Sequence, residues 1–237
     1  MTSFSYQKKT GLDLARFLFE NSIPEENPVI DSLAVSIQKL EKWIQKLMAD
    51  DPDDERGLHD LTIEEGCLLD DLVGISFIVC QRGITSVVSN YDFLRKQWLE
   101  HQKTIHYVEP TNDFLGIPIS PKNLKQELMV AANPALCSFS KIAMIDAFAN
   151  YYKHRDEWTN DWKDLTKQGM RTVDVIRAAG ADPGSLCLNC RKGYQTLTGE
   201  TSLVRLDLLW KIILDWSRAI REKCLEDLGR CGCSPKK

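Results

Sequence analysis

The run from Thr62 to Trp98 constrains the fold more than any other part of the sequence. It contains no proline, and its apolar side chains recur at intervals of three or four residues. This spacing places them on one side of an α-helix and predicts one long amphipathic helix. Thr62 followed by Glu65 matches a capping box, which predicts that the helix begins near Thr62. The apolar positions are Leu69, Leu72, Val73, Phe77, Cys80, Ile84, Val87, Tyr91, Leu94 and Trp98.

Helical spacing continues through most of the chain. Asn27-Pro28 is typical of a helix start, with an asparagine cap and proline in the first turn. A second long helix is predicted from Thr201 to Leu228. Shorter helices are predicted near 11–20, 121–132, 138–158 and 160–180. The fold class is therefore all-α: a helical bundle of about six or seven helices, two of them long.

No linker rich in glycine, serine or proline divides the chain. We therefore expect one domain over residues 1–237, with loose tails at 1–10 and 229–237. The segment FLGIPI, at 114–119, is either a short edge strand or a packed loop.

The composition favours a cytoplasmic protein without a membrane segment. The net charge of −4 gives no general attraction to nucleic acid or to an anionic membrane. The first residues lack the apolar stretch of a secretion signal. The longest apolar run, Leu72 to Cys80, is far shorter than the roughly 20 residues that cross a bilayer. In the cytoplasm the eight cysteines are expected to be reduced.

Two close cysteine pairs raise the hypothesis of a zinc site. Cys187 and Cys190 stand in a predicted loop at 181–200, and Cys231 and Cys233 stand in the C-terminal tail. Four thiolates can hold zinc tetrahedrally. The long helix predicted between the pairs separates them, which disfavours a shared ion. Free thiols, or a site completed by a partner, are the alternatives.

Common cofactor and catalytic motifs are absent. The chain has no phosphate-binding P-loop, no G-x-G-x-x-G, no G-x-S-x-G and no H-E-x-x-H. We therefore expect no cofactor. The acidic residues Glu64, Glu65, Asp70 and Asp71 are interpreted as a solvated helix face.

The helix predicted at 138–158 carries the densest group of reactive side chains. Residues four apart share a helix face, so Asn150 and His154 should project together. Ala143 and Ala147 precede them on the same stripe and leave room for a neighbouring helix. A simpler account is that the cations at the end of this helix complement its dipole, without any function.

RNA cleavage without a metal needs a proton acceptor, a proton donor and positive charge near the phosphate. His154, Asn150 and Arg155 are the candidate catalytic residues, because histidine exchanges protons near neutral pH. Tyr151 and Lys153 are the candidate RNA- or phosphate-binding residues.

The sequence ANYYKH, from Ala149 to His154, resembles the motif of the HEPN superfamily. That motif is an arginine, usually a polar residue, and then a histidine after four to six residues. HEPN proteins are helical bundles, commonly dimeric, and many are metal-independent endoribonucleases of toxin–antitoxin, phage-defence and CRISPR systems. Others have lost catalysis and serve as binding modules. The resemblance implies that His154 is the histidine and Asn150 the polar residue, while Ala149 replaces the arginine.

Three hypotheses follow. The first is a HEPN-like, non-catalytic binding or interaction module of a bacterial toxin–antitoxin or phage-defence system. It would form a homodimer or bind a protein partner, and RNA is a candidate ligand. The second is a metal-independent endoribonuclease that uses His154. The third is an unrelated helical scaffold, in which His154 would be buried or isolated from any cleft.

Overall fold

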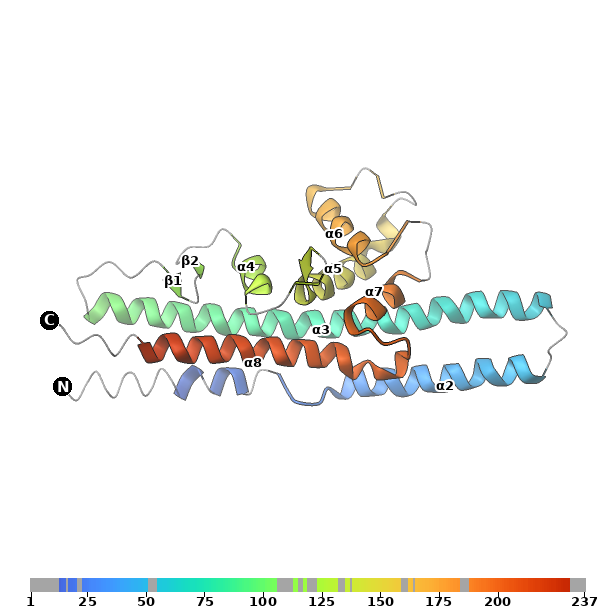
Figure 1. Ribbon diagram of the computed structural model, residues 1–237, viewed down its shortest axis with the longest axis horizontal. Helices are drawn as coiled ribbons and strands as arrows, with labels where there is room; N and C mark the ends of the chain where they lie inside the picture. Colours follow the sequence, from blue (N-terminus) through green and yellow to red (C-terminus); the bar gives the residue numbers. More distant parts are fainter. Residues whose placement is uncertain are drawn as a thin grey trace. The chain divides into compact units, whose positions relative to one another are not determined.

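The predicted all-α class is confirmed by the structure, a computed structural model of the chain. Residues 13–15, 17–20, 23–50, 55–105, 113–114, 117–118, 123–131, 135–136, 138–158, 162–163, 165–183 and 188–230 are described. Within them lie seven α-helices, α2 to α8, as well as helical residues at 13–15 and 17–20. The α-helices are α2 (Pro28–Asp50), α3 (Glu55–Ile105), α4 (Leu124–Val130), α5 (Lys141–His154), α6 (Lys167–Ala178), α7 (Asn189–Thr198) and α8 (Asp207–Arg230) (Figure 1).

The described strands are two residues long and form two small antiparallel pairs. β1 (Asp113–Phe114) pairs with β2 (Ile117–Pro118), and the pair overlaps the segment 114–119 that was expected to be a strand or a packed loop. β3 (Ala135–Leu136) pairs with β4 (Phe139–Ser140) directly before α5. Two short 3₁₀ helices, η1 (Arg155–Glu157) and η2 (Leu203–Arg205), follow α5 and precede α8.

Contacts between Cα atoms group the chain into two compact units. Unit 1 comprises residues 1–25, 83–133 and 213–237, and unit 2 comprises residues 26–82 and 134–212. In unit 1, the indole N–H of Trp216 donates to the carbonyl of Leu128 at 3.1 Å, which fixes α4 against α8. The amide of Asn90 donates to the carbonyl of Leu18 at 3.0 Å and attaches the first helical residues to α3.

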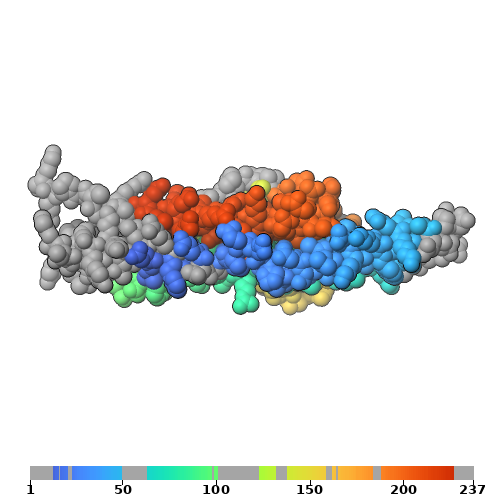
Figure 2. All heavy atoms as spheres, turned by 90° about the horizontal axis from the view of Figure 1, so that it is seen from below, coloured from blue at the N-terminus to red at the C-terminus, as the bar shows by residue number. Residues whose placement is uncertain are grey.

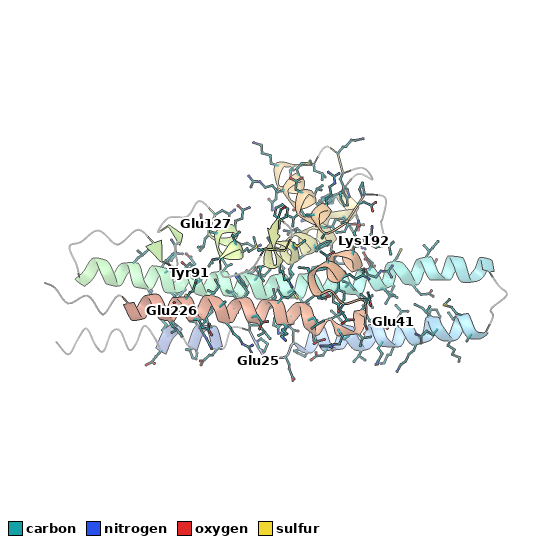
Figure 3. All side chains as sticks on the ribbon, in the orientation of Figure 1. Glu25, Glu41, Tyr91, Glu127, Lys192 and Glu226 are labelled. Atoms are coloured by element: carbon teal, nitrogen blue, oxygen red, sulfur yellow. The ribbon has the colours of Figure 1, made fainter. Side chains whose placement is uncertain are left out.

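In unit 2, α2 begins where the sequence predicted. The side-chain oxygen of Asn27 accepts the backbone N–H groups of Val29 at 3.0 Å and Ile30 at 3.3 Å, so Asn27 caps the helix. Figure 2 shows the atoms of α2 in blue, and Figure 3 shows its side chains as sticks, with Glu41 of this helix labelled. Trp43 and Val35 on this helix are about half exposed, at 47% and 50%. Single exposed apolar side chains of this kind are ordinary on protein surfaces.

The core of unit 2 lies where α3, α5 and α7 meet. The rings of Phe77 and Phe148 stack with centroids 5.1 Å apart. Gly74 of α3 lies under the ring of Tyr152, and Gly193 of α7 lies under the ring of Phe148. A Cβ atom at either glycine would overlap that ring, so both glycines allow the helices to approach closely.

Three predicted helix starts were wrong. α3 begins at Glu55, so Thr62 lies inside the helix and not at its cap. α6 begins at Lys167 with Thr166 as its cap, not near residue 160, because the Thr166 hydroxyl accepts the Gly169 N–H at 3.1 Å. α8 begins at Asp207, after η2, and not at Thr201.

The predicted loop at 181–200 was also wrong, since it contains α7. Cys190, Tyr194 and Leu197 of this helix are all buried, and they follow helical spacing. The helix ends at Gly199, whose φ of 73° is the left-handed conformation that glycine adopts at helix ends. The missed signal was this short apolar spacing followed by glycine.

The segment Ile63–Gln97 of α3 is long and apolar enough to cross a membrane by length and composition. Of its most apolar window, 44% is buried. Core helices of soluble proteins share these properties, so the cytoplasmic location stays a prediction.

Candidate functional site

The described part of unit 2 contains a pocket where the end of α5 faces the start of α6. Its volume is about 370 Å³, which lies within the range of small-molecule sites. Asn150 and His154, which the sequence placed on one helix face, both line it. α6 packs against α5. The other lining residues are Glu157, Trp158, Leu165, Thr166, Gln168, Gly169 and Thr172.

The imidazole of His154 interacts with a carboxylate one turn later. Its Nδ1 lies 3.2 Å from Oε2 of Glu157, and the side chains are 49% and 71% exposed. When Nδ1 carries the proton and donates to Glu157, Nε2 is left as a proton acceptor. Glu157 was not predicted as a site residue, although its spacing of three residues from His154 is a detectable signal.

The amide of Asn150 is held in a network with α3. Nε2 of Gln81 donates to Oδ1 of Asn150 at 3.0 Å and to Oδ1 of Asp146 at 2.6 Å. Nδ2 of Asn150 lies 3.5 Å from Oδ2 of Asp146, and Nζ of Lys153 donates to Oε1 of Gln81 at 2.8 Å. These contacts fix which side of the Asn150 amide donates and which accepts.

The two cations beside His154 bind groups outside the pocket. Nη2 of Arg155 lies 2.6 Å from Oδ1 of Asp71, and its guanidinium lies 4.6 Å from the ring centroid of Tyr152. Burial lowers the pKa of Arg155, but the hydrogen bond and charge of Asp71 raise it by more. Lys153 is exposed and contacts Gln81. The structure therefore brings neither candidate, Arg155 nor Lys153, into the described lining of the pocket.

Tyr151, a candidate phosphate ligand, lies in the core instead of the pocket. It is 2% exposed, and its hydroxyl accepts a hydrogen bond from Nδ2 of Asn189 at 3.0 Å. Burial raises its pKa. The rings of Trp158 and Trp162 lie 5.5 and 5.8 Å from the Tyr151 ring, between centroids. Tyr151 therefore packs against Trp158, which lines the pocket.

Ala149, at the position where the HEPN motif has arginine, is completely buried. It lies within α5 among buried neighbours and does not line the pocket. The methyl group of Ala149 fills a packed interior position, where a cationic side chain would have no exposed surface.

Of the four cysteines in the zinc hypothesis, Cys190 alone lies within the described residues; Cys187, Cys231 and Cys233 lie outside them. Cys190 is a free, fully buried thiol in the first turn of α7. Within the described ranges, no group of three or more histidine, cysteine or acidic side chains is arranged to hold a metal.

Cys67 is disulfide-bonded, so the prediction that all cysteines are reduced was wrong. That prediction came from the expected compartment alone, whereas sulfur pairing depends on which segments the fold brings together.

The interpretation of 64–71 as a solvated face was wrong for two of its four acidic residues. Asp70 has no exposed surface and Glu65 is only 6% exposed. Oδ1 of Asp70 accepts the backbone N–H of Arg191 at 2.9 Å, so this α3 carboxylate binds the N-terminus of α7. Helix N-termini attract negative charge, which explains a buried acid here.

Burial raises the pKa of Asp70 above its ordinary value of 3.8, although the N–H groups of Arg191 and Cys190 oppose this shift. Because the folded state holds the proton more tightly than the unfolded state, Asp70 lowers stability as pH rises from 3.8 through the raised pKa. Asp70→Asn removes this titration. The variant's stability relative to wild type should therefore increase with pH across that window.

Urea unfolding at a series of pH values measures this difference. Asp156→Asn, at a 97% exposed side chain, corrects for the loss of one negative charge. A difference between Asp70→Asn and wild type that stays flat or decreases with rising pH would contradict the prediction.

Four pocket residues from the start of α6 had no place in the sequence analysis: Thr166, Gln168, Gly169 and Thr172. Threonine is a common N-cap, because its hydroxyl accepts the backbone N–H three residues later. Recognising Thr166 as the cap would have placed the start of α6 correctly.

Comparison of the chain with protein-family models, with curated proteins and with solved structures found no match.

Proposed function

We propose that this protein is a HEPN-like helical binding module that holds a ligand in the pocket between α5 and α6 and does not cleave RNA. The observation that carries the proposal is the charge of the pocket. None of its described lining residues is lysine or arginine. Cleavage of RNA without a metal requires a cation near the phosphate, since negative charge develops there in the transition state.

The position of His154 supports a binding site over a scaffold without a site. The scaffold hypothesis expects His154 to be buried or away from any cleft, whereas its side chain is 49% exposed and lines the pocket. As the sequence analysis expected, we propose that the module acts as a homodimer or with a protein partner. A bacterial toxin–antitoxin or phage-defence system is the proposed setting, and a map of adjacent genes would test it.

The second candidate function is a metal-independent endoribonuclease. It is favoured by the contact between Nδ1 of His154 and Glu157, which would leave Nε2 as a general base. Two observations disfavour this function. None of the described residues that line the pocket is lysine or arginine, and Ala149 stands where the HEPN motif has arginine.

Incubation of the purified full chain with mixed RNA in EDTA distinguishes the two functions. We expect no cleavage by wild type, and no difference between wild type and His154→Ala. Lys167→Ala, at an exposed side chain outside the lining, is the matched surface control. Cleavage that His154→Ala abolishes and Lys167→Ala retains would overturn the proposal in favour of the endoribonuclease.

A further inference from the structure

Sulfur and carboxylate groups meet where the start of α7 packs against α3 (Figure 1). The carboxylate of Asp70 accepts the backbone N–H of Arg191 at 2.9 Å and also interacts with the backbone N–H of Cys190. Burial raises the pKa of the Cys190 thiol well above its ordinary value, and the charge of Asp70 raises this pKa further. The thiol and the carboxylate therefore lie close together, and both residues are completely buried.

One oxygen of this carboxylate lacks a hydrogen bond. Oδ2 of Asp70 is buried and has no hydrogen-bond partner in the part of the chain that the structure describes. The Cys190 thiol interacts with the carboxylate electrostatically, but it does not meet the geometry of a hydrogen bond to Oδ2. A buried carboxylate oxygen without a partner costs free energy. A metal cation would satisfy it, and zinc binds carboxylate oxygen as well as cysteine sulfur.

Cys67 places a third candidate ligand on the same part of α3. It precedes Asp70 by three residues, and side chains at this spacing are neighbours on a helix. A Cβ atom on the preceding residue, Gly66, would lie 3.4 Å from Nη2 of Arg191. This segment of α3 therefore faces the start of α7. Cys67 is partly exposed, so small reagents can reach its sulfur.

The disulfide of Cys67 holds a fourth candidate ligand beside it. Cys80, Cys190 and Cys224 are free, so the bonded sulfur belongs to a cysteine outside the described residues. Among those cysteines, Cys187 forms a C-x-x-C pair with Cys190 in the sequence, a spacing found in many zinc sites. Reduction of the disulfide would leave two thiols there, in addition to Cys190 and the Asp70 carboxylate.

We infer that this junction of α3 and α7 binds a zinc ion when the Cys67 disulfide is reduced. The ligands are Cys67, Cys190, Asp70 and the cysteine that now bonds Cys67. Cysteine sulfurs with one carboxylate oxygen suit a closed, tetrahedral site of the structural kind. While Cys67 is oxidised, Asp70 and Cys190 alone remain, which agrees with the lack of a group of three ligands in the described ranges. The inference is independent of the ligand in the pocket between α5 and α6.

The disulfide and the zinc ion exclude one another, because zinc binds cysteine as a thiolate. Two molecules of a small thiol such as glutathione would break the S–S bond. They would join as a disulfide, and their protons would pass to Cys67 and its partner. Zinc then displaces the thiol protons of its cysteine ligands into solvent. The predicted cytoplasmic location favours the reduced, zinc-bound form, and oxidation would release the ion.

Elemental analysis of the full chain tests the site. The chain is reduced, incubated with zinc sulfate and separated from free zinc on a desalting column. We expect one zinc ion per chain, and loss of that ion when the loaded chain is treated with oxidised glutathione. A reduced chain that retains no zinc, or equal zinc contents in the reduced and oxidised chains, would overturn the inference.

Variants locate the ion. Cys190→Ala and Cys67→Ala should each weaken zinc binding at least about tenfold, a loss that supporting groups around metal sites already produce. Cys80→Ala is the matched control, because Cys80 is also a free, completely buried thiol. It should change zinc affinity less than about twofold. Competition with a chromophoric chelator measures these affinities. Equal binding by wild type and Cys190→Ala would identify an adventitious ion only and refute the site.

Cobalt provides a second measurement on the wild-type chain, which decides the result if Cys190→Ala does not fold. The reduced chain loaded with Co²⁺ should show thiolate-to-cobalt charge-transfer absorption and the strong visible bands of tetrahedral cobalt. The oxidised chain should show neither. Weak bands of six-coordinate cobalt in the reduced chain, without charge-transfer absorption, would contradict a site made of cysteine ligands.

Discussion

Phe148→Ala should lower the free energy of unfolding by about 3–5 kcal/mol, as expected when a buried phenylalanine is truncated in a packed core. Phe148 has no exposed surface, stacks on Phe77 and covers Gly193. The glycine offers no side chain to fill the space that the ring leaves, so the cavity should persist. Urea unfolding followed by circular dichroism measures the loss.

Phe93→Ala is the matched control, because the same ring is 45% exposed on α3. It should change stability by less than about 1 kcal/mol. Hydrogen exchange should show the Phe148→Ala effect in α5 and α7, which Phe148 joins. If Phe148→Ala and Phe93→Ala lowered the free energy of unfolding equally, the contact between α5, α3 and α7 would not be a core contact.

Asn189→Ala should lower the free energy of unfolding by about 2–4 kcal/mol, because it removes three hydrogen bonds and leaves the buried Tyr151 hydroxyl without this partner. Asn189 is 1% exposed. Its Nδ2 donates to the Tyr151 hydroxyl at 3.0 Å and to the carbonyl of Asp182 at 2.9 Å. Its Oδ1 accepts the backbone N–H of Asp182 at 3.1 Å. One side chain therefore joins α5, the segment after α6 and the start of α7.

A double-mutant cycle with Tyr151→Phe isolates one of these bonds. Tyr151→Phe removes the hydroxyl alone, and the coupling energy between the two substitutions should be about 0.5–1.5 kcal/mol. The same variant addresses the phosphate role that the sequence assigned to Tyr151. Loss of stability with unchanged ligand binding is the expected result. Additive effects, with no coupling, would contradict the hydrogen bond.

Helical periodicity was sufficient to predict the fold class, since α2 and α3 repeat apolar residues over many turns. α7 was missed because it is short, and because its polar residues and Gly193 are typical of a loop. Its stability comes from burial against Phe148, a contact far away in the sequence. The cap at Thr166 was missed for a different reason: the helix was predicted to begin near residue 160, several residues before the observed start.

The candidate site could be predicted only where its residues share one helix. Asn150 and His154 were placed together because they are four residues apart. The orientation of Asn150 depends on Gln81, and the pairing of Arg155 depends on Asp71, both on α3. No local pattern relates these residues, because packing of α5 on α3 brings them together. For the same reason the sequence could not show that Tyr151 is buried.

The complete burial of Ala149 bears on how this chain could change over time. Introducing arginine there would force a long cation into a filled interior, with both overpacking and desolvation costs. If an ancestor carried the arginine, a single reversal could not restore it, because neighbouring side chains would first have to become smaller. The present packing would therefore preserve the alanine, whatever residue selection favours at the pocket.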